Sequence, residues 1–246
     1  MGTRYDSASL MYGDERIVFQ RHDRPHNTRS VLIKVHPSCE VEVMAPPHAS
    51  HDEVLGAVRK RARWIYKQLE EFKDSQEHVL ARRYLSGESH YYMGRQHTLK
   101  VVDVDRHTPQ GVKLLRGKFE VHTRSREVSK IKHLLNAWYK ERAEQVFDRR
   151  LDAMLDQALW VDDKPEFKTM FMTKQWGNCS PTGALTLNVH LVKAPRECID
   201  YVILHELCHI AEHNHSDRFY SLLSQVLPGW KEVKHRLDRK AHMFMS

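Results

Sequence analysis

The chain has 246 residues, which is enough for one large domain or two smaller ones with a buried core. Its formal net charge is +7, from 39 basic and 32 acidic residues. This mild excess favours encounters with nucleic acid or another polyanion, and it is also typical of a solvated basic surface. No apolar run approaches the roughly 20 residues of a membrane span. The composition therefore argues against an integral membrane protein.

The cysteines and the first residues bear on the compartment. The four cysteines form no C-x-x-C pair, and the opening MGTRYDSASL has neither the basic nor the apolar region of a secretory leader. We therefore expect free thiols and a cytoplasmic protein.

The first predicted elements are strands. Residues 16–22 and 30–47 alternate apolar and polar side chains, which predicts a half-buried hairpin that turns at Pro37 and Ser38. Residues 91–105 and 111–123 are rich in β-branched residues, and they predict two further hairpins. Glycines stand at the expected turns of these later hairpins, namely Gly94 and Gly117.

Two long helices are predicted. Ser50 and Glu53 form a capping-box pattern that starts a helix over residues 51–73, and apolar residues then recur at helical spacing. Its other face carries basic side chains that could touch phosphates or simply face solvent: Arg59, Lys60, Arg63 and Lys67. A second amphipathic helix has apolar residues on or near one stripe: Val128, Ile131, Leu135, Trp138, Val146, Leu151 and Met154.

We place a domain boundary near residue 125, ahead of the second helix. This gives an N-terminal β-rich module with one amphipathic helix over residues 1–125, and a second domain over residues 126–246.

The C-terminal part alternates strands and helices. The segments FKTMFMTKQWGNCS and ALTLNVHLVKAP predict two strands joined by a turn at 180–183. A helix starts between Pro195 and Asp200. Ser216 is the expected N-cap of another helix, and a final basic helix runs from Trp230 to about residue 240.

The helix after Pro195 carries an H-E-x-x-H motif. His205 and His209 lie one turn apart on one face, a spacing that suits a single tetrahedral cation such as Zn²⁺. Glu206 beside them is a candidate general base. The 18 histidines of the chain make chance pairs common, but the flanking residues are apolar, and buried imidazoles without a cation would be costly.

A catalytic site of this kind needs a third protein ligand, with the fourth position left for water. We prefer His215, which follows an expected helix end at His213 and Asn214, where Asn can adopt left-handed geometry and turn the chain back. His213 is the competing third ligand.

The segment WGNCSPTGALTLNVHLVKAPRECIDYVILHELCHIAEHNHSDRF resembles the YgjP-like metallopeptidase family, whose pattern is W-G-S-C-S, a short turn, L-N, a proline, D-Y-V, H-E-L-x-H, N-H-S and a final F. The upstream segments VEVMAPP, RARWIYKQ and YLSGESHYYMGRQHTLKV are similar as well, so the likeness covers most of residues 16–240. Asn178 stands where the family pattern has serine.

This resemblance implies an α+β protein in which an N-terminal β-rich module precedes a zincin-like metalloprotease domain, related to SprT-like proteases, with an H-E-x-x-H active-site helix. It also implies Zn²⁺ bound by His205, His209 and His215, with Glu206 as the catalytic residue in peptide hydrolysis. The WGNC strand could hold an extended peptide.

Gln175, Trp176 and Asn188 are candidate residues of the substrate cleft, although Trp176 could equally belong to the core. Cys179 could be an inhibitory metal ligand, but we favour a buried thiol.

The sequence leaves two other functions open. Some members of this family are described as nucleoside triphosphate (UTP) pyrophosphohydrolases, and a metal site can also serve phosphoryl chemistry. No P-loop supports this reading. The third hypothesis is a DNA-associated protease or binding module, for which no zinc ribbon or helix-turn-helix is evident. The oligomeric state is not predicted.

Overall fold

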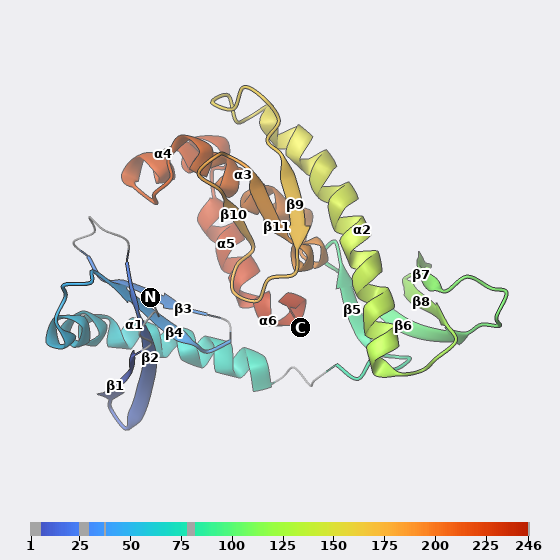
Figure 1. The fold of residues 1–246 in the computed structure, drawn as a ribbon, viewed down its shortest axis with the longest axis horizontal. Coiled ribbons are helices and arrows are strands. Elements are labelled where there is room, and N and C mark those ends of the chain that lie inside the picture. The colour runs from blue at the N-terminus through green and yellow to red at the C-terminus, as the bar shows by residue number, and fades with distance from the viewer. Residues whose placement is uncertain (1–5, 25–29, 37, 78–81, 246) are drawn as a thin grey trace. The chain divides into compact units, whose positions relative to one another are not determined.

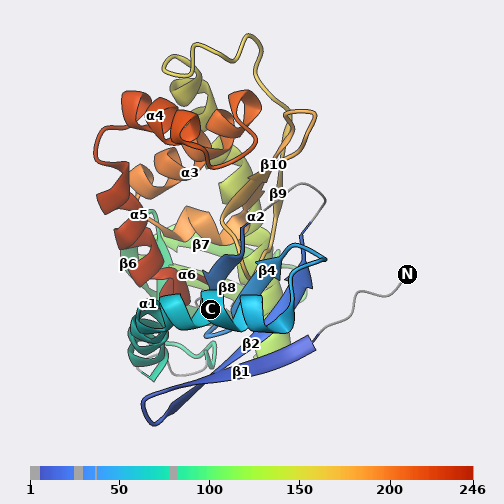
Figure 2. The ribbon, with the colours of Figure 1, turned by 90° about the vertical axis from the view of Figure 1, so that its left-hand side faces the viewer.

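A computed structural model describes residues 6–24, 30–36, 38–77 and 82–245. The chain divides into two compact units, Met1–Leu80 and Ala81–Ser246, whose elements are drawn in Figure 1 and, from a second direction, in Figure 2. Each unit has its own buried apolar cluster and is described by itself.

Unit 1, residues 1–80, is a four-stranded sheet followed by a long helix. Its elements are β1 (Asp6–Tyr12), β2 (Glu15–Asp23), β3 (Leu32–Val35), β4 (Val41–Ala45) and α1 (His51–Glu77). The strand order is β1-β2-β4-β3, with antiparallel outer pairs and a parallel β2–β4 pair in the middle. Alternate strand residues such as Phe19 and Val43 are buried and pack with one stripe of α1: Val54, Val58, Ala62 and Ile65.

The predictions for unit 1 are largely confirmed. β3 and β4 form the expected hairpin, although Pro37 of its turn lies outside the described residues. The capping box is present, because the Glu53 amide donates to the Ser50 hydroxyl at 3.2 Å and the Ser50 amide donates to the Glu53 carboxylate at 2.7 Å. The basic residues on the outer face of α1 are exposed: Arg59, Lys60, Arg63 and Lys67. Strand β1 was not predicted.

Unit 2, residues 81–246, begins with a second sheet and helix of the same kind. The elements are β5 (Ser89–Tyr92), β6 (Arg95–Asp103), β7 (Gly111–Leu115), β8 (Lys118–Thr123) and α2 (Val128–Leu155). The strand order is β5-β6-β8-β7, again with a parallel central pair. Gly94 and Gly117 occupy the two predicted turns with φ of 75° and 78°, a conformation that favours glycine.

The rest of unit 2 is a small sheet with a series of helices. Its elements are β9 (Phe167–Met170), β10 (Gly177–Cys179), β11 (Leu185–Asn188), η1 (Val189–Lys193), α3 (Arg196–Ala211), α4 (Asp217–Val226), α5 (Trp230–Arg239) and α6 (Ala241–Met245). The strand order is β10-β11-β9. The predicted single strand before the 180–183 turn is in fact two strands, because β9 pairs with β11 in parallel while only β10 forms the antiparallel hairpin.

The predicted domain boundary near residue 125 does not coincide with the division at residues 80 and 81. Residues of β6 and β8, including Leu99 and Phe119, share one apolar cluster with α2 and α3. The turn after β5 is also tied to η1, because the Met93 amide donates to the Val192 carbonyl at 2.9 Å and the Gly94 amide donates to that of Lys193 at 3.0 Å. The second sheet therefore belongs with the C-terminal elements.

None of the helices in the described part of the chain combines the length and apolar character needed to cross a membrane. All four cysteines are free, as expected.

Candidate metal centre

Helix α3 carries the H-E-x-x-H motif through the core of unit 2. It starts directly after Pro195, as predicted, and its apolar residues are buried. Two side-chain contacts anchor it from elsewhere in the unit. Arg150 of α2 pairs with Asp200 at 2.6 Å, and the Trp160 indole donates to the Leu207 carbonyl at 2.9 Å. The motif therefore lies on a rigid element.

The structure brings three imidazoles together. One ring nitrogen from each of His205, His209 and His215 lies within 4.8 Å of the other two. The Nε2 atoms of His205 and His215 are 3.0 Å apart. The first two histidines are half-buried on α3, and His215 is exposed beyond its end. Among the described residues, this is the group of histidines, cysteines and carboxylates that could hold a metal ion.

The surroundings of the rings favour neutral imidazoles. Burial, followed by the neighbouring His215 and His209, lowers the pKa of His205 to about 3. The Nδ1 atom of His209 lies 3.1 Å from the Glu212 carbonyl and can donate a hydrogen bond to it. In that tautomer the Nε2 atom of His209 has a free lone pair that can bind a metal. Phe219, fully buried on α4, packs against all three rings with centroid separations of 4.6 to 4.9 Å.

This donor set fits Zn²⁺. Tetrahedral bonds of about 2.0–2.1 Å would place the ligand nitrogens roughly 3.3 Å apart, which is close to the 3.0 Å between the Nε2 atoms of His205 and His215. Three neutral imidazoles with a fourth position for water are typical of catalytic zinc sites. The Nε2 atoms of His205 and His215 face one another at 3.0 Å, so a cation between them could bind both lone pairs.

His215 reaches the cluster by a different turn from the one predicted. Helix α3 ends at Ala211, and Glu212 leaves it in an extended conformation with φ of −135°. Asn214 is not among the described non-glycine residues with positive φ, so the expected left-handed turn is wrong. A tight turn instead links the Ser216 amide to the Asn214 carbonyl at 2.7 Å. His213 is exposed and lies outside the cluster.

The N-cap predicted at Ser216 is confirmed, because its hydroxyl accepts from the Phe219 amide at 3.3 Å. This cap begins α4 directly after His215, and it holds the first turn of the helix that presents Phe219 to the rings.

Glu206 is buried on the same helix, with 5% of its surface exposed. Burial raises its pKa to about 8. Its carboxylate lies against Gly177 of β10, where a side-chain Cβ would approach Oε1 to 2.8 Å. Glycine at this position is therefore what lets the carboxylate pack beside the strand.

The three cleft candidates differ in their burial and in their contacts. Gln175 is exposed and Trp176 is half-buried against the core of unit 2. Asn188 is fully buried and does not line a cleft. Its side chain accepts from the Met172 and His190 amides and donates to the Met172 and Gln175 carbonyls, so it shapes the loop before β10.

Cys179 is half-buried, donates to the Ser180 carbonyl at 3.4 Å, and is not part of the histidine cluster.

Sequence reasoning missed two residues of the centre. Phe219 follows the N-cap by three residues, which placed it on a helix but gave no sign that it packs against the imidazoles. Gly177 was assigned to a strand, and a glycine inside a strand is a signal of close backbone approach that could have marked it.

The chain was compared with family models, curated proteins and solved structures. A family model described as YgjP-like, metallopeptidase domain, matches residues 29–240. Among solved structures, the metallopeptidase zymogen abylysin of Pyrococcus abyssi is 22% identical and aligns over 37% of this chain and 90% of its own, with a TM-score of 0.35. The metallopeptidase zymogen jannalysin of Methanocaldococcus jannaschii is 21% identical, with 40% and 96% covered and a TM-score of 0.33. No curated protein matches.

The family match spans most of the chain, including both the sheet and helix of unit 2 and the histidine cluster. The chain belongs to the YgjP-like metallopeptidase family and is a metal-dependent hydrolase.

Proposed function

We propose that this protein is a zinc peptidase whose metal is held by His205, His209 and His215, with Glu206 as general base. The observation that carries the proposal is the cluster of three imidazole nitrogens within 4.8 Å of one another. Two of these rings lie on α3, which also carries the buried Glu206 carboxylate, and the third follows the end of that helix. Membership of a metallopeptidase family supports a peptide or protein substrate.

A zinc ion at this centre would supply a Lewis acid that lowers the pKa of a water and polarises a carbonyl. Glu206 would accept a proton from the attacking water and deliver it to the leaving amine. A divalent cation beside the carboxylate favours its ionised form, which opposes the effect of burial. The buried position of Glu206 excludes competing solvent from this proton transfer.

Strand β10 is the candidate surface for the substrate. In the described residues it pairs on one side with β11 and lies at the edge of its sheet. An extended peptide could add to such an edge through main-chain hydrogen bonds. Gly177 places this strand directly against the Glu206 carboxylate, so a peptide on the edge would lie near the base. Gln175 and Trp176 precede the strand and are the remaining cleft candidates.

The test compares zinc-loaded wild type with Glu206→Gln on an unfolded protein and on UTP, following new amines and released pyrophosphate. We expect cleavage of the protein by wild type and a loss of about 10²–10⁴ in kcat in the variant, with zinc content unchanged. The control is Glu197→Gln, which removes a partly exposed carboxylate from the first turn of the same helix.

Full turnover by zinc-loaded Glu206→Gln would overturn the assignment of the base. Release of pyrophosphate that requires Glu206, without cleavage of protein, would overturn the peptide substrate in favour of a nucleotide.

A further inference from the structure

A second polar cluster of unit 2 surrounds a cavity of about 210 Å³. The residues that line it and could meet a ligand are Arg82, His90, Lys132, Tyr139, His190 and Lys193. They come from β5, α2 and η1 and from the segment before β5. None of the lining residues in the described part of the chain is acidic. The cavity is therefore lined by three basic side chains and two histidines.

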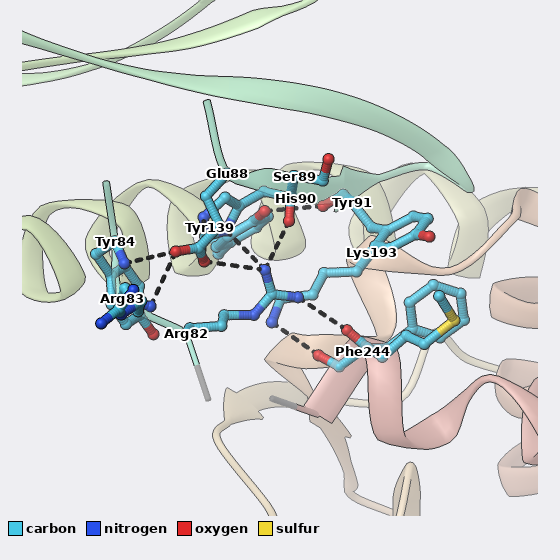
Figure 3. Close-up of polar contacts among 11 residues, drawn as sticks. Arg82, Arg83, Tyr84, Glu88, Ser89, His90, Tyr91, Tyr139, Lys193 and Phe244 are labelled. Carbon is cyan, nitrogen blue, oxygen red and sulfur yellow. Dashed lines mark hydrogen bonds and ion pairs between the residues drawn. The ribbon is translucent and has the colours of Figure 1, made fainter. Parts of the chain in front are cut away.

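Arg82 is held by contacts on both sides, as Figure 3 shows. Its guanidinium donates to the Ser89 carbonyl at 2.7 Å and to the Met243 carbonyl at 3.1 Å. Glu88 lies 3.6 Å from it, and the same carboxylate accepts from the Tyr84 amide at 2.6 Å. These contacts fix the position of a cation at the wall of the cavity.

Lys193 is the most deeply placed cation, with 4% of its surface exposed. Its ammonium donates to the Phe244 carbonyl at 2.7 Å and lies 5.1 Å from the centre of the Tyr139 ring (Figure 3). Burial, and then the charges of Arg82 and Lys132, lower its pKa well below the usual range. Burial and these two charges therefore both disfavour the charged form of Lys193.

The two histidines add neutral donors or acceptors. His90 is 2% exposed, and burial lowers its pKa to about 3. Its Nδ1 atom lies 3.4 Å from Arg82, so this nitrogen is the acceptor and Nε2 carries the proton. The pKa of His190 is also about 3, through burial and then the charges of Lys193, Arg82 and Lys132. Its buried Nδ1 atom has no hydrogen-bond partner in the described residues.

We propose that this cavity binds a small oxyanion, such as inorganic phosphate or the phosphate end of a larger molecule. The Arg82 guanidinium, the Lys132 and Lys193 side chains and the His190 ring converge on a partly buried space, where they can donate to the acceptor oxygens of such an ion.

The dimensions agree with a small ligand. A volume of about 210 Å³ lies below the range of roughly 300–1,000 Å³ that is usual for larger organic ligands. Lys132 is exposed, whereas His90 and Lys193 are buried, so the cavity runs from a solvent-facing cation to a buried end. This site uses none of the residues assigned to the metal centre and stands independently of the proposed peptidase function.

The test titrates the full-length protein with inorganic phosphate by calorimetry, with ionic strength kept constant by sodium chloride. We expect one saturable site in wild type. Lys132→Gln should weaken binding by about 3- to 10-fold, and Lys132→Glu by more than about 10-fold, since an exposed position tolerates both changes. Lys140→Gln, which removes another exposed lysine of α2 that does not line the cavity, should bind as wild type does.

Repeating the titration after dialysis against a chelator separates this site from the metal centre, because binding here should not change. Phenyl phosphate as a second probe distinguishes the two sources of the anion: if it binds, the site accepts the phosphate end of a larger molecule, and if only inorganic phosphate binds, the site holds a free ion. The absence of saturable binding, or equal affinity in wild type and both Lys132 variants, would overturn the proposal.

Discussion

The sheet and helix of unit 1 have the same topology as the first sheet and helix of unit 2. Each sheet consists of two antiparallel pairs joined by a parallel central pair, and a helix of 27 residues follows in one case and of 28 in the other. The two helices differ in what they bury. α1 buries one stripe against its own sheet, whereas α2 buries nine side chains.

The difference follows from the neighbours of each helix. Within unit 2, α2 contacts β7 and β8 of its own sheet and also β9, η1 and α3. Within unit 1, α1 contacts β1, β3 and β4. The same topology therefore forms a sheet-and-helix layer in unit 1, and in unit 2 it supports the helix of the candidate metal centre.

The largest expected effect on stability comes from removing a buried ring, and its effect on zinc binding should differ between the cores of the two units. Phe147→Ala removes a fully buried ring from α2 and should lower the free energy of unfolding by about 3–5 kcal/mol, with weaker zinc binding because α2 supports α3. Phe19→Ala in unit 1 removes a ring that is equally buried and should cost a similar amount while zinc affinity stays unchanged. Chemical unfolding measures the free energy of unfolding of each variant, and a zinc competition assay measures its zinc affinity. Equal zinc affinity in the two variants would contradict this division of roles.

The pH dependence that arises from Glu206 should be confined to unit 2. Burial raises the pKa of Glu206 from 4.5 to about 8, so between these values the folded metal-free protein holds a proton that the unfolded chain has lost. The free energy of unfolding should therefore fall as pH rises, by on the order of 3 kcal/mol between pH 5 and pH 8.

Glu206→Gln should remove this contribution, so the measured quantity is the difference between wild type and variant in urea unfolding at the two pH values. Histidine titrations occur in both proteins and cancel in that difference. A difference that does not change with pH would show that Glu206 does not retain its proton.

Zinc should stabilise unit 2 and leave unit 1 unaffected. At a free zinc concentration of 100 times Kd, the gain is about 2.7 kcal/mol. His215→Ala should abolish this gain, whereas His213→Ala, at an exposed residue outside the cluster, should retain it. Hydrogen exchange with and without zinc resolves the two units. If zinc protected α1 from exchange as much as α3, the prediction that zinc stabilises only unit 2 would be contradicted.

Substitutions of two glycines should have opposite outcomes. Gly177→Ala places a methyl group 2.8 Å from the Glu206 carboxylate and should lower kcat by about 10- to 100-fold, with zinc retained, because the base is displaced. Gly56→Ala in α1 meets open space and should raise the stability of unit 1 by about 0.5–1 kcal/mol. Peptidase kinetics and thermal unfolding provide the two measurements, and unchanged kcat in Gly177→Ala would contradict the proposed contact.

The smallest effects are at the two helix caps. Ser50→Ala and Ser216→Ala should each cost about 1 kcal/mol, and replacement by glycine should cost only a few tenths. Only Ser216→Ala should also weaken zinc binding, because its helix carries Phe219. A zinc titration of both variants tests this, and an equal change in affinity would contradict it.

The sequence predicted the helix caps, turns and helix starts that depend on residues close together in the chain. The Ser50 and Ser216 caps, the Gly94 and Gly117 turns and the start of α3 after Pro195 all depend on residues within a few positions of one another. His215 was expected beside His205 and His209 from its place after the helix and from the family resemblance, and it does lie there, although the turn before it has no left-handed Asn214.

Long-range packing was not predictable in the same way. The stripe expected on α2 omitted Tyr139, Ala143 and Phe147, which are buried because several elements cover this helix. The pairing of β9 in parallel with β11 depends on partners distant in sequence, and so does the placement of the second sheet in unit 2. The role of Asn188 was misread because a polar residue at the end of a strand can serve a ligand or a loop with the same sequence signal.

The proposed metal ligands lie on two kinds of backbone: His205 and His209 on a helix, and His215 on the turn that follows it. A cation bound by all three would act as a cross-link that closes a loop of ten residues between the first ligand and the last. Such a closure reduces the conformational entropy of the chain outside the helix, much as a short covalent bridge would. Removing the cation would then loosen the junction of α3 and α4, while the interior of α3 stays held by its own hydrogen bonds and by Trp160 and Arg150.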